Sequence, residues 1–160
     1  MESKEIEMKN KYQPVSPSEL KNVVGPRPGC VAFNDVVMFH EHKNGVYPAG
    51  IYNRRNVRGS RGPVTARNAS LHAAGRAVDI GISNKAEGDK LAAKIIAAAD
   101  MIGVCEVIWY AKRTTSKGTL PYHGVDLHKT HIHVGFTTDF ASRHNTPDLK
   151  KWISHFLFGA

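Results

Sequence analysis

Two histidines, His131 and His133, stand two residues apart in the segment HIHVGF at 131–136, whose composition is typical of a β-strand. Side chains two apart on a strand project to the same face, so both imidazoles would reach one site. Imidazole is a common metal ligand and a common general base. A pair of surface histidines on an exposed strand explains the same pattern, so this segment by itself leaves the chemistry open.

A further histidine and an aspartate lie in the earlier segment 70–79, SLHAAGRAVD. Apolar residues alternate from 77 to 82, which predicts a strand with Asp79 facing away from its apolar side. His72 and Asp79, taken singly, would more often be hydrogen-bonded structural residues. Combined with the later histidines they form a set that suits zinc, and three protein ligands leave a fourth position open for catalysis.

The other elements must hold these residues in place. Proline, glycine, capping residues and hydrophobic periodicity divide the chain into five predicted strands and three predicted helices. The strands are 31–39, 45–57, 77–82, 104–110 and 131–136, and the helices are 16–20, 84–103 and 146–158. The segment KRTTSKG at 112–118 is predicted to be a turn. These elements predict an α+β fold with most strands grouped around one connecting helix.

Composition limits the classes of protein to which the chain could belong. Its 160 residues fit a polar arm at 1–14 and a single domain at 15–160. The formal charge of +8 predicts attraction to a polyanion such as nucleic acid, cell wall or acidic lipid. Two cysteines are too few for a disulfide framework and predict reduced, buried thiols. We expect no membrane span and no secretory signal, hence a cytoplasmic protein until it is released.

The two histidine segments resemble one known family. SLHAAGRAVD is similar to the SxHxxGxAxD signature of the zinc D-Ala-D-Ala carboxypeptidase and Hedgehog-like superfamily, and HKTHIH at 128–133 is similar to the HxxHxH element of its peptidoglycan-cleaving members. The resemblance covers roughly 50–136. It implies one zinc ion per chain held by His72, Asp79 and His133, on a small antiparallel sheet flanked by helices. Other first-row metals would suit the same ligands.

The resemblance also implies a peptidase, which needs a group that moves protons. Many relatives carry a carboxylate three residues before the last ligand, but this chain has Thr130 there. The base could be His131 or His128, as in lysostaphin-like relatives. Glu106 and Asp126 are carboxylate alternatives.

An arginine that precedes the first ligand in these peptidases steadies the substrate carboxylate or the oxyanion. By position Arg55 is the favoured candidate, with Arg54 and Arg67 behind it. The function implied is that of an endolysin or cell-wall hydrolase, of the kind used by phages for cytolysis. Its substrate would be a peptidoglycan peptide within an anionic wall, and the protein would be a monomer. Cleavage of L-Ala-D-Glu, D-Ala-diaminopimelate and D-Ala-D-Ala bonds all remain open.

The sequence also suggests two alternative functions. Thr130 favours a metal-bearing pseudo-peptidase that binds wall peptide or another polyanion without cleaving it. The net charge suggests a nucleic-acid binder, but the sequence carries no known nucleic-acid motif, and its aromatics do not interleave with the basic clusters. We therefore expect no specific nucleic-acid partner.

Overall fold

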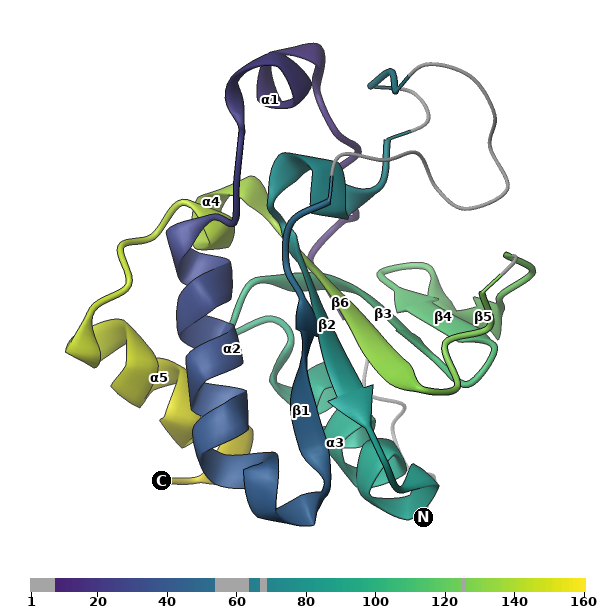
Figure 1. Ribbon diagram of the computed structural model, residues 1–160, viewed down its shortest axis with the longest axis vertical. Helices are drawn as coiled ribbons and strands as arrows, with labels where there is room; N and C mark the ends of the chain where they lie inside the picture. Colours follow the sequence, from purple (N-terminus) through teal and green to yellow (C-terminus); the bar gives the residue numbers. More distant parts are fainter. Residues whose placement is uncertain (1–7, 54–63, 67–68, 125) are drawn as a thin grey trace.

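A computed structural model describes residues 8–53, 64–66, 69–124 and 126–160 of the chain (Figure 1). The helices are α1 (Pro17–Asn22), α2 (Pro28–Glu41), α3 (Lys85–Ala98), α4 (Thr138–Ala141) and α5 (Pro147–Phe158). The strands are β1 (Val46–Gly50), β2 (Ala77–Ile82), β3 (Val104–Trp109), β4 (Lys112–Thr115), β5 (Gly118–Pro121) and β6 (His131–Phe136). The described part of the chain contains no helix that is long and apolar enough to cross a membrane.

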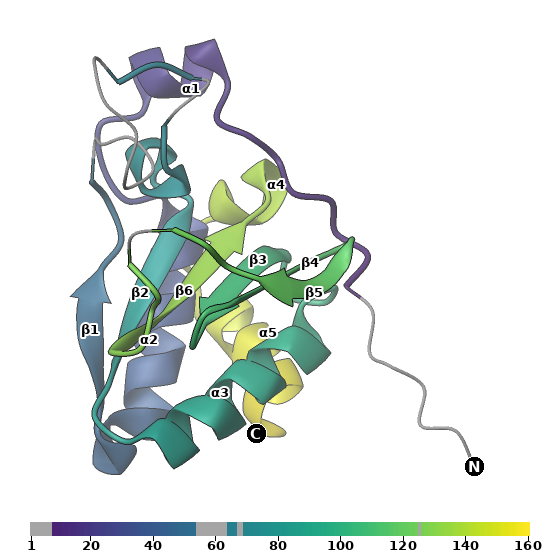
Figure 2. The same cartoon turned by 90° about the vertical axis from the view of Figure 1, so that its right-hand side faces the viewer.

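The six strands form one sheet in the order β1-β2-β6-β3-β4-β5. Every neighbouring pair is antiparallel. The long helices α2, α3 and α5 gather on one side of this sheet, as the two views in Figures 1 and 2 show. The expected α+β architecture of a small antiparallel sheet flanked by helices is therefore confirmed.

The two faces of the sheet have different roles. Val78, Ile80, Ile132, Val134 and Phe136 are fully buried in the main hydrophobic core. Because side chains alternate along a strand, the residues between them project to the opposite face. Asp79 lies on that opposite face, as its alternation with the apolar residues predicted.

The strand predicted at 31–39 is wrong, because this segment lies within helix α2. Its β-branched and aromatic residues favoured a strand, but the buried residues recur at helical spacing, at Cys30, Phe33 and Val37. Pro28 occupies the first turn, where its missing N–H costs nothing. Packing against β1, β2 and α5 outweighs the local strand preference.

The turn predicted at 112–118 is also wrong, since it contains β4 and the start of β5. Thr114 and Thr119 face each other across this hairpin, and their hydroxyl oxygens lie 2.9 Å apart. A short polar segment gives little strand signal, and here the strand depends on pairing with β3. Of the strand predicted at 45–57, β1 covers Val46–Gly50, residues 51–53 are not in a strand, and 54–57 lie outside the described residues.

The described end of the predicted polar arm packs against the domain. Met8 is 3% exposed. Arg76 is fully buried, and its guanidinium donates to the carbonyl oxygens of Gln13 and Phe136, each at 2.7 Å, and to Glu19 Oε2 at 2.8 Å. This buried arginine therefore fixes the path of the chain just before α1.

The remaining local expectations hold. The helix expected at 16–20 is α1, the helix expected at 84–103 is α3 followed by turns, and the helix expected at 146–158 is α5. Cys30 and Cys105 are free and buried. Burial raises the pKa of these thiols to about 12 and about 11, respectively, so both stay protonated near neutral pH.

Candidate metal centre

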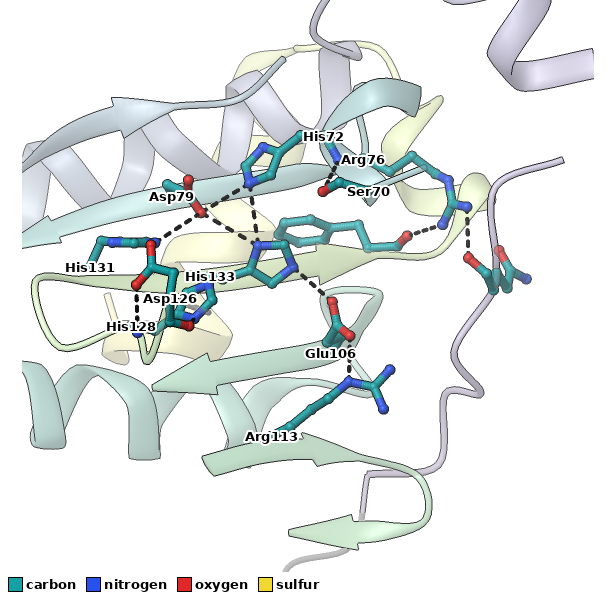
Figure 3. A network of polar contacts seen from close by, with 12 residues as sticks. Ser70, His72, Arg76, Asp79, Glu106, Arg113, Asp126, His128, His131 and His133 are labelled. Carbon is teal, nitrogen blue, oxygen red and sulfur yellow. Dashed lines mark hydrogen bonds and ion pairs between the residues drawn. The ribbon is translucent and has the colours of Figure 1, made fainter. Parts of the chain in front are cut away.

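Two antiparallel strands and a short turn bring three potential ligands together (Figure 3). Asp79 of β2 lies directly opposite His133 of β6 in the strand register. His72 belongs to a 3₁₀ turn, Leu71–Ala74, that ends at Gly75 with a φ of 65°. A Cβ at Gly75 would come within 2.3 Å of the Gly25 carbonyl oxygen, so only glycine allows this close turn.

The ligand-type atoms of these three residues converge. Asp79 Oδ1 lies 3.0 Å from His72 Nε2 and 3.5 Å from His133 Nδ1, and the two imidazole nitrogens are 3.3 Å apart. A tetrahedral zinc ion with bonds near 2.0–2.1 Å separates its ligand atoms by about 3.3 Å. The separations in this cluster therefore fit a single zinc ion.

The far nitrogens of both imidazoles are already engaged. His72 Nδ1 donates to the Ile51 carbonyl oxygen at 2.9 Å, and His133 Nε2 donates to Glu106 Oε1 at 2.7 Å. In the metal-free protein the nitrogens that face Asp79 hydrogen-bond to its carboxylate. On metal binding each imidazole would keep its outer N–H and would offer the lone pair of the nitrogen that faces Asp79 to the ion. Metal-binding histidines show this arrangement because the outer hydrogen bond fixes the ring's orientation and tautomer.

The electrostatics of the cluster favour a positive charge between its carboxylates. Burial alone would lower the pKa of His133, but hydrogen bonds to Asp79 and Glu106 raise it to about 9. Burial alone would raise the pKa of Asp79, but hydrogen bonds from His133 and His72 hold it well below its usual range. A cation bound between these residues would satisfy the same carboxylate as a proton on His133.

Glu106 is buried on β3 and bridges His133 to an arginine of β4. Burial opposes its ionisation, yet His133 and Arg113 lower the pKa of its carboxyl to about 2. Arg113 Nε donates to Glu106 Oε2 at 2.6 Å. Glu106 is predicted from the sequence as a possible catalytic carboxylate, whereas the structure places it behind His133. This location suits a positioning residue.

We predict that Glu106→Gln weakens zinc binding by about 10- to 100-fold without changing the fold, since mutation of an outer hydrogen-bond partner typically has that cost. The glutamine amide cannot supply the negative charge that strengthens His133 as a ligand. Competition with a zinc-sensitive dye would measure the affinity, and circular dichroism would check the fold. An exposed carboxylate, Asp148, provides the matched control Asp148→Asn. An unchanged zinc affinity in the Glu106 variant would refute the role.

A second group of polar residues lies beside the first. Asp126, His128 and His131 place one ligand-type atom each within 4.8 Å of one another. His131 Nε2 lies 4.0 Å from Asp79 Oδ1 and 3.8 Å from Asp126 Oδ2, so it stands between the two groups. His128 Nδ1 donates to the Asp126 carbonyl oxygen at 2.8 Å. Burial, together with His133 and His131, lowers the pKa of His128 to about 4, which keeps it neutral near pH 7.

Both groups open onto a cavity of about 600 Å³. Its lining includes Asp79, His131 and His133, and also Tyr12 from the N-terminal segment and Arg113 from β4. Tyr12 and Arg113 are not among the predicted site residues. Tyr12 lies in the predicted polar arm, and Arg113 lies in the segment predicted to be a turn. No sequence pattern marks either residue, because only strand pairing and chain packing bring them to the cavity.

Of the other predicted site residues, some lie outside the described residues and others lie beside His131. Arg55, Arg54 and Arg67 lie outside the described residues. Thr130 places its hydroxyl oxygen 3.3 Å from His131 Nδ1, so a hydroxyl stands where many relatives of the resembled family have a carboxylate. Asp126, a predicted alternative base, supplies the nearest described carboxylate on that side of His131.

A family model described as VldE, C-terminal domain, matches residues 39–133, which is more than half of the chain. The matched range includes His72, Asp79 and His133. No curated protein and no solved structure matches.

Proposed function

The chain belongs to the VldE C-terminal domain family, and from this premise and the geometry of its site we propose that it is a zinc-dependent peptidase. Its substrate would be an amide bond in the peptide part of bacterial peptidoglycan. The resemblance of its two histidine segments to zinc D-Ala-D-Ala carboxypeptidases supports this choice of reaction and substrate.

One observation carries the proposal. His72, Asp79 and His133 place three ligand atoms within 3.5 Å of one another beside a cavity, and both histidines have their far nitrogens occupied. Three ligands of these types, with open space beside them, suit a catalytic rather than a structural zinc site. Bound zinc would polarise the scissile carbonyl and lower the pKa of a water molecule.

The chain's own residues would supply the proton transfers. His131 projects from the same strand face as His133 and is 16% exposed, so it can reach both the cavity and the ligand cluster. In this role Nε2 of His131 accepts a proton from the attacking water and later returns it to the leaving amine. Asp126 would stabilise the protonated imidazole, and neutral His128 would limit the positive charge beside it.

The net charge supports an anionic target. The chain carries a formal charge of +8, and bacterial walls are rich in phosphate and carboxylate groups. A basic protein would therefore concentrate at such a wall through long-range attraction. This contribution should weaken as salt concentration rises.

The decisive experiment measures new amino groups released from purified peptidoglycan by the native protein. We expect release that stops with a chelator and returns when zinc is added back. Mass spectrometry of the new termini would identify the bond. Release that persists in chelator would exclude a zinc peptidase.

Thr130 favours one alternative, a metal-bearing protein that binds wall peptide without cleaving it. No carboxylate stands at this position to accept a proton, and its hydroxyl cannot replace one near neutral pH. Stoichiometric zinc binding with no release from several wall types would favour this alternative.

A further inference from the structure

The cavity wall beyond the ligand cluster contains an arginine, Arg113, that uses only part of its hydrogen-bonding capacity. Arg113 is the only lysine or arginine that lines the cavity in the described part of the chain. Its side chain is 36% exposed, and it donates through Nε to Glu106. Figure 3 shows its two Nη nitrogens without a partner among the residues drawn, and no hydrogen bond joins them to any described residue.

Strand register places Arg113 in line with the ligands. Asp79 of β2 lies opposite His133 of β6, His133 lies opposite Ile108 of β3, and Ile108 lies opposite Arg113 of β4. Two strand spacings separate β6 from β4, or about 10 Å. An extended peptide covers that distance in about three residues.

Tyr12 holds the guanidinium on its other side. The Cζ of Arg113 lies 4.9 Å from the centre of the Tyr12 ring. Stacking of this kind leaves the N–H groups at the edge of the guanidinium available for hydrogen bonds. Arg113 is therefore oriented by Glu106 and Tyr12 before any ligand arrives.

The chain on both sides of Tyr12 is anchored. Asn10 Nδ2 donates to the carbonyl oxygens of Ala99 and Val104, both at 3.1 Å. Gln13 accepts a hydrogen bond from Arg76 through its carbonyl oxygen and one from the Thr138 N–H through its side chain. Residues 10–13 are therefore held against the domain, and Tyr12 is a fixed part of the cavity wall.

We infer that Arg113 and Tyr12 form a carboxylate-binding subsite, which selects peptides with a free carboxylate within about three residues of the scissile bond. The two Nη nitrogens match the two oxygens of a carboxylate, and the cavity provides partial shielding from water. This inference rests on the proposed peptidase function, because it names the substrate class of the same site.

The test compares three forms of one peptide, L-Ala-γ-D-Glu-L-Lys-D-Ala-D-Ala. One form has both carboxylates free, the second has the D-glutamate α-carboxyl amidated, and the third has the C-terminal carboxyl amidated. Binding to zinc-free protein is measured by calorimetry, and KM and kcat are measured with zinc. We expect one amidation to weaken binding by about 10-fold or more, the usual worth of hydrogen bonds to a charged group.

Variants of Arg113 distinguish recognition of the peptide carboxylate from positioning of Glu106. Arg113→Gln should abolish the preference for the free carboxylate, and Arg113→Lys should restore part of it, because lysine keeps the charge but not the paired donors. Lys112→Gln is the matched control, since Lys112 is the exposed neighbour on the same strand and does not line the cavity. It should leave the preference unchanged.

Two results would overturn the inference. Equal binding of all three peptides by the native protein would exclude the subsite, whether or not the variants fold. Arg113→Gln that weakens zinc binding yet keeps the preference would show that Arg113 only positions Glu106. Cleavage without carboxylate preference would refute the subsite alone, whereas a carboxylate preference without cleavage would support the subsite and refute the peptidase.

Discussion

Replacing His133 with alanine is expected to eliminate stoichiometric zinc binding and to reduce peptidoglycan cleavage to background. His133 supplies the Nδ1 that lies 3.3 Å from His72 Nε2 and 3.5 Å from Asp79 Oδ1, so its removal leaves two ligands. The loss of zinc affinity should exceed the factor of about 10 to 100 that is expected when only an outer hydrogen-bond partner of a ligand is mutated. His72→Ala and Asp79→Ala should have the same effect.

Zinc content after dialysis, measured by atomic emission, checks this result independently of activity. His144→Ala is the matched control, because His144 is exposed and belongs to neither histidine group. It should retain one zinc ion per chain. Full zinc occupancy in His133→Ala would contradict the ligand assignment and would direct attention to Asp126, His128 and His131.

Replacing His131 with alanine should retain the zinc ion while lowering kcat by about 10²- to 10⁴-fold, the usual contribution of a general acid–base group. His131 Nε2 is 4.0 Å from Asp79 Oδ1, farther than either proposed histidine ligand. The zinc cluster should therefore remain complete without this imidazole. The change should appear in kcat more than in KM, because the lost group acts on the transferred proton.

The two histidines of the same strand thus give opposite expectations for one measurement. Zinc content should fall in His133→Ala and stay at one per chain in His131→Ala. If His131→Ala retains full activity, the proton acceptor is another group, and Asp126 is the nearest described carboxylate on that side. If it loses zinc, His131 is a ligand.

The sequence by itself was sufficient for features that depend on short-range periodicity. Alternation over 77–82 and 131–136 predicted two strands, with Asp79 on the face away from the core and His131 and His133 on one face. Capping residues and helical spacing predicted α1, α3 and α5. Each pattern is complete within about twenty residues, so no long-range contact is needed to read it.

Local sequence patterns gave wrong predictions where tertiary packing outweighed the local preference of a segment for helix, strand or turn. The residues of α2 favour a strand by composition, but they form a helix because one helical face packs against the sheet. The hairpin of β4 and β5 has few apolar residues and depends on pairing with β3. Neither outcome is visible within the segment itself, because the stabilising partner lies elsewhere in the chain.

In the candidate metal centre, too, local sequence patterns and tertiary structure determine different features. The sequence supplied the ligand types His72, Asp79 and His133, but only the tertiary structure decided which nitrogen of each histidine faces Asp79. That choice depends on the Ile51 carbonyl and on Glu106, which lie 21 and 27 residues away from the histidines they orient. Strand register likewise brought Arg113 into line with the ligands. Periodicity fixes the face of a residue, whereas register and packing fix its neighbours.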